Sequence, residues 1–224
     1  MRLTVDIINE SECRINPLKD RELYLRGLKI PEIENFGSTK DLNDSIDLSD
    51  NDLLQLGNFP LLPRLKKLYL SNNRISIIDP LIAKQLPNLN TLILTNNQVS
   101  GLEYLLPLKE MSKLEHLSLI GNPVVNLNYY RLFCIFLCKK IRFVDFQRVK
   151  DEERKQANSL FLNEKGEFSS IALGIINKVP AKTFEANTIA TQNNEVKNTS
   201  ALQSLTEEEQ KRIQASLNKV SNLV

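Results

Sequence analysis

Apolar residues recur at a regular spacing along the middle of the chain, and leucine supplies most of them. Three segments, which begin at Leu65, Leu89 and Leu114, carry leucine at their first, fourth and sixth positions, asparagine at the ninth, and isoleucine or valine at the eleventh. Three further segments fit the pattern less completely. The fourth positions of all six segments are Leu23, Ile46, Leu68, Leu92, Leu117 and Val144. They lie 23, 22, 24, 25 and 27 residues apart, so the pattern is an internal repeat.

Each repeat predicts one short strand with an apolar side. The fourth and sixth side chains point the same way because side chains alternate along an extended chain. A single repeat cannot bury that side alone, so successive repeats must stack. A period of roughly 20–29 residues with this pattern is typical of leucine-rich repeats. We therefore predict an α/β fold, a right-handed leucine-rich repeat solenoid of five to six repeats with a parallel sheet on its concave side.

The ninth position is polar in four of the repeats, although the strand beside it is apolar. It holds Asn51, Asn73, Asn97 and Asn122. An amide buried where the chain turns away from the strand can satisfy backbone groups that the turn leaves unpaired. We predict that these asparagines are structural.

Helical caps are expected at both ends, because an open stack exposes its core. At the N-terminus, Leu3, Ile7 and Ile8 fall on one helical face and Thr4 is placed as an N-cap, which predicts a helix over residues 4–13. At the other end, a helix is expected after Tyr130. Its apolar face consists of Leu132, Phe133, Phe136 and Leu137. A polar helix that begins at Asp151 follows.

The repeat domain with its caps is predicted to span residues 1–162. Residues 163–200 have no periodicity and are rich in Asn, Thr, Ser and Ala, which predicts a disordered linker. Residues 201–224 predict an amphipathic helix with a capping box at Thr206 and apolar residues at helical spacing after it. This helix could dock on a partner or back on the repeats, and the sequence leaves both possibilities open.

The candidate binding surface is the side of the sheet opposite the buried leucines, formed by the third, fifth and seventh positions of the repeats; we call it the concave face. Tyrosine, isoleucine and small polar residues alternate there, a composition typical of protein-binding surfaces. The predicted partner-binding residues on this face are Tyr24, Asp47, Tyr69, Ile93, Thr95, Ile120 and Asp145.

Composition and charge exclude several classes of protein. Lys and Arg number 29 against 27 Asp and Glu, so the chain has no strong field of one sign. The single histidine, His116, has no catalytic motif around it, and seven glycines form no phosphate-binding loop. We expect neither enzymatic activity nor a cofactor or metal. Acids in the first twelve residues argue against a signal peptide, and no apolar run is long enough for a membrane span. The chain is expected to be soluble and intracellular.

Three cysteines, an odd number, argue against a disulfide framework and for a reducing compartment. Cys134 and Cys138 lie four residues apart on the predicted C-terminal cap helix. They are interpreted as small buried residues rather than a metal or redox pair, because no histidine or third cysteine lies near them.

Charges also cluster. Five aspartates and no base occupy residues 41–52, whereas seven bases face four acids between residues 139 and 155. This polarity suggests contact with a basic protein surface near the second repeat and with an acidic polymer near the C-terminal cap. Read alone, the basic cluster is an ordinary solvated face.

Two motifs are not required by the repeat. Residues 20–35 read DRELYLRGLKIPEIEN, and residues 144–150 read VDFQRVK, followed by Glu153-Arg154. Together with IDLSDN at 46–51, LILTNN at 92–97 and Tyr130-Arg131-Leu132, they resemble the A-prime family of the spliceosomal U2 small nuclear ribonucleoprotein. The resemblance runs in register over about residues 15–160.

This resemblance implies a nuclear, non-enzymatic role in pre-mRNA splicing. The concave face would hold a helix of the RRM-containing B-double-prime protein, and the pair would bind a stem-loop of U2 snRNA; other spliceosomal partners are possible. The residues expected to lie toward the RNA are Arg26, Lys29, Arg148 and Lys150. The alternative is a leucine-rich repeat regulatory subunit of a protein phosphatase, which the repeat length and concave face would also suit.

Overall fold

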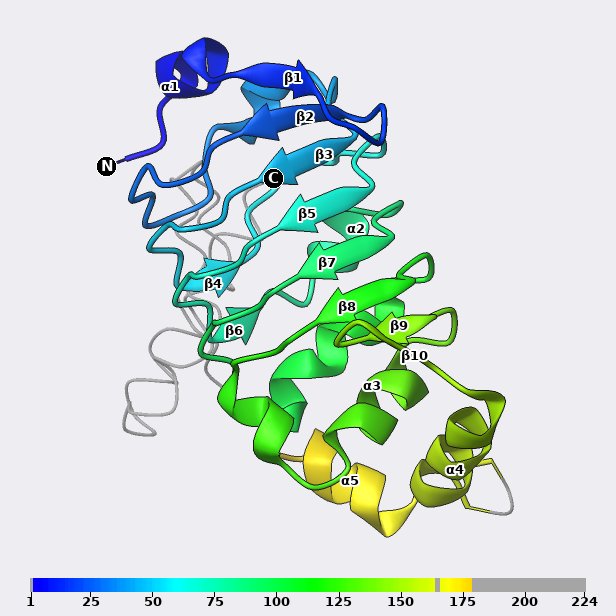
Figure 1. Ribbon diagram of the computed structural model, residues 1–224. Helices are drawn as coiled ribbons and strands as arrows, with labels where there is room; N and C mark the ends of the chain where they lie inside the picture. Colours follow the sequence, from blue (N-terminus) through cyan, green and yellow to red (C-terminus); the bar gives the residue numbers. More distant parts are fainter. Residues whose placement is uncertain (1, 164–165, 179–224) are drawn as a thin grey trace, which may run out of the picture. The chain divides into compact units, whose positions relative to one another are not determined.

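The computed structural model describes residues 2–163 and 166–178 of the 224-residue chain. Its helices are α1 (Val5–Glu10), η1 (Phe36–Thr39), α2 (Ile82–Gln85), η2 (Leu102–Glu110), η3 (Pro123–Asn126), α3 (Tyr130–Leu137), α4 (Asp151–Phe161) and α5 (Ser170–Ile176). Its strands are β1 (Cys13–Ile15), β2 (Arg21–Tyr24), β3 (Ser45–Asp47), β4 (Gln55–Leu56), β5 (Lys67–Tyr69), β6 (Ile77–Ile78), β7 (Thr91–Ile93), β8 (His116–Ser118), β9 (Phe143–Val144) and β10 (Gln147–Arg148). Figure 1 shows the strands of the larger sheet one after another, with α1 at one end and α3, α4 and α5 at the other.

The larger sheet confirms the repeat register. Its order is β1-β2-β3-β5-β7-β8-β9-β10, and β2 to β9 pair in parallel. The fourth positions of the repeats lie side by side along it, as Leu23, Ile46, Leu68, Leu92, Leu117 and Val144. All six side chains are buried. The predicted leucine-rich repeat solenoid is therefore confirmed, with six parallel strands in the described chain.

The four ninth-position asparagines are buried and connect each repeat to its neighbours. The Asn97 carbonyl accepts from Ile75 N–H at 3.0 Å, while its amide donates to the carbonyls of Leu70 at 2.9 Å and Leu94 at 3.0 Å. Asn51, Asn73 and Asn122 repeat this arrangement. We call these residues the buried asparagine ladder. Their predicted structural role is confirmed.

A second ladder lies on the surface, at the eighth position of the first five repeats, which in four of them is just before the buried asparagine. The backbone there is left-handed, which suits glycine, asparagine and aspartate best. The residues are Gly27, Asp50, Asn72, Asn96 and Gly121, with φ between +53° and +77°. The Asn96 amide donates to Asn72 at 2.9 Å, and the Asn72 amide donates to Asp50 at 2.6 Å. Gly121 has φ +77°, where an L side chain is strained, and a Cβ there would also lie only 3.2 Å from the Asn96 Cα, so this position favours glycine.

The N-terminal end is closed by a helix and a strand. Thr4 caps α1 as predicted, accepting from Ile7 N–H, and Leu3 and Ile8 are buried under it. The prediction that the helix runs to residue 13 is wrong, because α1 ends at Glu10 and Cys13 begins β1. β1 pairs antiparallel with β2 and covers what would otherwise be an open sheet edge.

The C-terminal end is also closed by a hairpin and helices. β10 pairs antiparallel with β9, and α3 packs against α4. Phe133 and Leu137 of α3 are buried as predicted, while Leu132 and Phe136 are half-buried against the core. α4 begins after Lys150, where the Glu153 carboxylate accepts from Lys150 N–H at 2.8 Å. Glu153 also pairs with Arg131 at 2.7 Å, which joins the two cap helices.

The predicted start of the linker at residue 163 is wrong. The chain continues into α5, capped by the Ser169 hydroxyl, which accepts from Ala172 N–H. Ala172 and Ile175 are buried in the same core as the repeats, and Phe168 packs against it. The sequence did not predict α5, because the helix is too short to show a periodic pattern and polar residues surround it. The remaining linker and the predicted helix over 201–224 lie outside the described residues.

Replacing Asn97 with alanine tests the buried asparagine ladder. The change leaves Ile75 N–H and two carbonyls without partners inside the core, and each such group costs about 1–3 kcal/mol. We expect the free energy of unfolding to fall by roughly 2–4 kcal/mol, measured by urea denaturation. The exposed Asn128→Ala serves as the control and should change it by less than about 0.5 kcal/mol. Equal effects from both variants would contradict the proposed role.

Candidate protein-binding face

Strand pairing aligns two rows of side chains on the concave face, the fifth positions and the third positions of the repeats. Strand pairing sets Tyr24 beside Asp47, Asp47 beside Tyr69, and Tyr69 beside Ile93. The neighbouring row of third positions runs Glu22, Ser45, Lys67, Thr91, His116 and Phe143. The structure thus brings together four of the predicted partner-binding residues in one continuous row. None of these four is fully buried, so their side chains are open to a partner.

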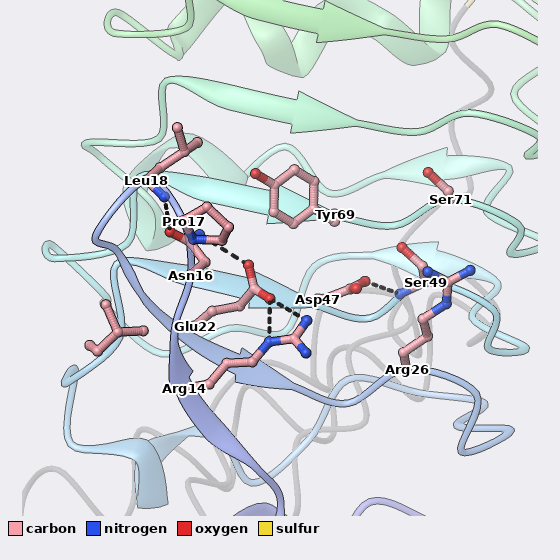
Figure 2. Close-up of a pocket in the computed structure, with 11 residues that line it drawn as sticks. Arg14, Asn16, Pro17, Leu18, Glu22, Arg26, Asp47, Ser49, Tyr69 and Ser71 are labelled. Carbon is pink, nitrogen blue, oxygen red and sulfur yellow. Dashed lines mark hydrogen bonds and ion pairs between the residues drawn. The ribbon is translucent and has the colours of Figure 1, made fainter.

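A hollow of about 750 Å³ opens at the N-terminal end of this face (Figure 2). Its floor comes from β2, β3 and β5, and its rim is the turn between β1 and β2. The lining residues are Arg14, Ile15, Asn16, Pro17, Leu18, Glu22, Arg26, Asp47, Ser49, Tyr69 and Ser71. Ile15 and Leu18 are about two-thirds exposed, at 67% and 68%. The sequence prediction missed this rim, because it ended the N-terminal helix at residue 13 and assigned no element to the residues between that helix and the first repeat.

Glu22 lies beneath the rim and is only 7% exposed. Its carboxylate accepts from Arg14 at 3.0 Å, from the Asn16 amide at 3.2 Å and from the Ser45 hydroxyl at 3.4 Å. A buried carboxylate needs such partners, because burial without them destabilises its charge. Next to this group, Lys67 pairs with Asp20 at 2.6 Å. These contacts hold the turn between β1 and β2 over the sheet.

The aromatic residues of the row are held by their surroundings. The Arg14 guanidinium lies 4.6 Å from the centre of the Tyr24 ring, within range of a cation–π interaction. Tyr69 is half-buried, and burial together with nearby carboxylates raises the pKa of its hydroxyl. It therefore stays a neutral hydrogen-bond donor. One carboxylate oxygen of Asp47 accepts from Ser49 N–H at 2.9 Å.

The C-terminal half of the face is less open than predicted. Thr95 and Ser118 share a hydrogen bond at 3.1 Å, and Ser118 is only 1% exposed. Ile120 is 40% exposed and available to a partner. Asp145, by contrast, accepts from Leu119 N–H at 2.8 Å and from the Tyr130 hydroxyl at 2.9 Å. Both of its oxygens hold the cap in place, so the structure gives Asp145 an anchoring role rather than a free place in the row.

The four residues expected to lie toward RNA fall into two separate groups. Arg26 and Lys29 follow β2, whereas Arg148 ends β10 and Lys150 precedes α4. Six strand spacings separate the groups, or roughly 29 Å at about 4.8 Å per spacing. Arg26 also pairs with Asp50, at the end of the surface ladder, while Arg148 and Lys150 are exposed.

No metal or membrane site emerges from the described part of the chain. The side chains of His, Cys, Asp and Glu form no cluster there that could hold a metal ion. Cys134 and Cys138 are buried, as their interpretation as small core residues predicted. Burial raises the pKa of the Cys138 thiol to about 12 and the pKa of the Cys134 thiol well above its ordinary value. Across residues 2–163 and 166–178, no helix is long and apolar enough to cross a bilayer.

A family described as leucine-rich repeat matches residues 1–175, which includes α5 apart from its last residue. The chain is therefore a leucine-rich repeat protein whose sheet carries an open face of aromatic and polar residues. The U2 small nuclear ribonucleoprotein A' of Mycosarcoma maydis is 43% identical over 187 residues, covering 84% of this chain and 76% of that protein. The A' protein of Aspergillus fumigatus is 47% identical, covering 72% of this chain but only 63% of its own length. The chain belongs to the U2 small nuclear ribonucleoprotein A' family.

A solved structure agrees with this assignment. The crystal structure of the Drosophila melanogaster SNF/U2A' complex contains a chain that is 46% identical and superposes with a TM-score of 0.71. The match covers 74% of this chain and 95% of that one. The resemblance found in the motifs of residues 20–35 and 144–150 is thus confirmed at the level of the family.

Thiol alkylation tests the burial of the cysteine pair. At about pH 8 we expect iodoacetamide to modify the exposed Cys13 and to leave Cys134 and Cys138 unmodified in the folded protein, because thiolates react and burial suppresses their formation. Mass spectrometry of the peptides measures each site. Denaturation before labelling should make all three react. Rapid labelling of Cys134 or Cys138 without denaturation would contradict the burial described.

Proposed function

We propose that this chain is a non-enzymatic protein scaffold of the U2 small nuclear ribonucleoprotein and acts in pre-mRNA splicing in the nucleus. The observation that carries the proposal is the open row from Tyr24 to Ile93 in a chain of the A' family, for which a relative has been solved in a complex with another protein. A second observation supports a scaffold role without catalysis: carboxylates on the concave face are engaged in hydrogen bonds and ion pairs that hold the fold. Glu22 and Asp145 are examples.

The partner on the concave face is an RRM-containing protein of the B-double-prime type, which presents a helix to the row. The Drosophila structure, a complex of U2A' with SNF, supports a protein partner on this family. The geometry supports a helix as the bound element, because the row runs across the strands as one line of neighbouring side chains. Tyr69 and Ile93 are the middle two of the six fifth positions, since the line continues past Ile93 to Ser118 and Asp145, and side chains at the centre of an interface contribute most to binding.

RNA contact comes mainly through the heterodimer. Arg26 already has a carboxylate partner in Asp50, and the two basic groups are too far apart to form one phosphate-binding surface on this chain alone. Arg148 and Lys150, next to the C-terminal cap, are exposed and suit contact with a stem-loop that the partner holds. The alternative of a phosphatase regulatory subunit gains no support from the relatives described above.

Substitutions at the centre of the row test the partner site. Tyr69→Ala and Ile93→Asp should each weaken binding of the RRM partner by at least about tenfold in isothermal titration calorimetry, because they remove or charge a central apolar contact. Lys84→Ala, an exposed change on α2, should leave the affinity unchanged. Circular dichroism establishes that each variant is folded. Folded variants that bind normally would sink the assignment of this face.

The dependence of RNA binding on the partner tests the scaffold role itself. We expect this chain alone to bind the U2 snRNA stem-loop weakly in an electrophoretic mobility shift assay, and the equimolar complex with the partner to bind it at least about tenfold more tightly. Arg148→Ala with Lys150→Ala should reduce the affinity of the complex and leave assembly of the two proteins intact. Equal RNA affinity with and without the partner would count against the proposal.

A further inference from the structure

A second hollow, of about 450 Å³, lies on the C-terminal cap rather than on the concave face. Its walls come from η2, α3, α4 and the segment that leads into α5, which Figure 1 places at the end of the solenoid. The residues that line it belong neither to the repeat pattern as a set nor to one of the two family motifs. Its walls combine apolar side chains with three cations, and this combination defines what the hollow can bind.

The apolar wall is a rigid row of aromatic rings. The Phe133 and Phe136 rings both pack on Phe161, with centroids 5.3 Å and 5.1 Å away. Phe136 then meets Phe168 edge to face at 6.2 Å. Phe136 and Phe168 line the hollow together with Leu162, and all three remain half-buried. The wall is therefore preformed, and it leaves apolar surface that one further side chain can cover.

The rim carries Lys109, Lys139 and Arg154. Within the described residues, none of the three takes part in an ion pair. Arg154 donates to the backbone carbonyls of Lys139 and Ile141, which fixes its guanidinium at the rim. A guanidinium has five N–H donors, so donors remain for a carboxylate. Glu153, which adjoins Arg154 in the chain, is already paired with Arg131.

We propose that this hollow binds an acidic peptide segment of another protein, which inserts one apolar side chain between Phe136, Leu162 and Phe168 and pairs its carboxylates with the three cations. Charge complementarity carries this choice of occupant, because three cations that form no ion pair with any described carboxylate surround a largely apolar hollow with room for a side chain. A nucleobase fits less well. Stacking needs an open ring face, and the Phe168 face already has the Lys109 ammonium 5.2 Å from its centre.

The inference does not depend on the proposed function. The concave face is lined by strand side chains, whereas this hollow is lined by cap helices and the segment after α4, so both can be occupied together. A scaffold with two such surfaces joins two proteins.

Fluorescence anisotropy with the full chain tests the site. The probe is a labelled ten-residue peptide of aspartate and glutamate with one central phenylalanine. We expect saturable binding, with an affinity that falls by at least about tenfold in Lys109→Glu and in Lys139→Glu. The control Lys113→Glu makes an equal change of charge outside the hollow and should change the affinity by less than about twofold. Replacing the probe's phenylalanine with alanine, or its acids with amides, should each lose about tenfold or more.

Three outcomes would overturn the proposal. Equal weakening by Lys113→Glu would mean that the probe senses only overall charge. Tighter binding of a labelled ten-nucleotide uridine RNA, lost in the Lys109 and Lys139 variants, would assign the hollow to nucleic acid. Displacement of the probe by a peptide of residues 204–224, at a lower concentration than by the unlabelled probe itself, would make the occupant this chain's own C-terminal segment.

Discussion

The repeat fold depends on how each turn disposes of its backbone hydrogen-bonding groups. When the chain leaves a β-strand and turns inside an apolar core, some of its N–H and C=O groups lose their partners where water cannot reach them. Leaving such groups unpaired lowers the stability of the fold. In four of the six repeats one asparagine meets this need: as at Asn97, its carbonyl accepts from an N–H of the preceding repeat, and its amide donates to carbonyls of two repeats. Strand register follows, and with it the alignment of the side chains on the concave face.

The features that recur from repeat to repeat could be predicted from the sequence. The six strands, their register, the buried asparagines and the row from Tyr24 to Ile93 all follow from spacing. The features that the sequence did not predict each occur only once in the described chain. β1 is too short for a pattern, Glu22 became buried only because the turn after β1 folds over it, and α5 has a single buried side. Asp145 shows a further limit: its place in the repeat was correctly identified, but its bonds to Leu119 and Tyr130 come from a non-repeating cap.

The two ends of the sheet are closed in the same way and then diverge. Each terminal parallel strand has an antiparallel neighbour, β1 or β10, which removes the open edge that invites aggregation. At the N-terminal end the added segment bends over the concave face and binds Glu22 and Lys67 through Arg14, Asn16 and Asp20. At the C-terminal end it leads into helices that cover the core and expose cations. The basic end of the solenoid therefore arises from the C-terminal cap, whereas the aspartates of residues 41–52 belong to the second repeat.

The spacing of the parallel strands has a consequence for any helix that lies across them. Neighbouring strands are about 4.8 Å apart, and an α-helix rises about 5.4 Å per turn. One helical turn therefore lies opposite each strand, and the mismatch between the two spacings grows by about 0.6 Å per repeat. Over the three intervals from Tyr24 to Ile93 the offset stays below about 2 Å, within the reach of a side chain. A much longer row would lose phase with its partner, so a short solenoid is well matched to gripping a single helix.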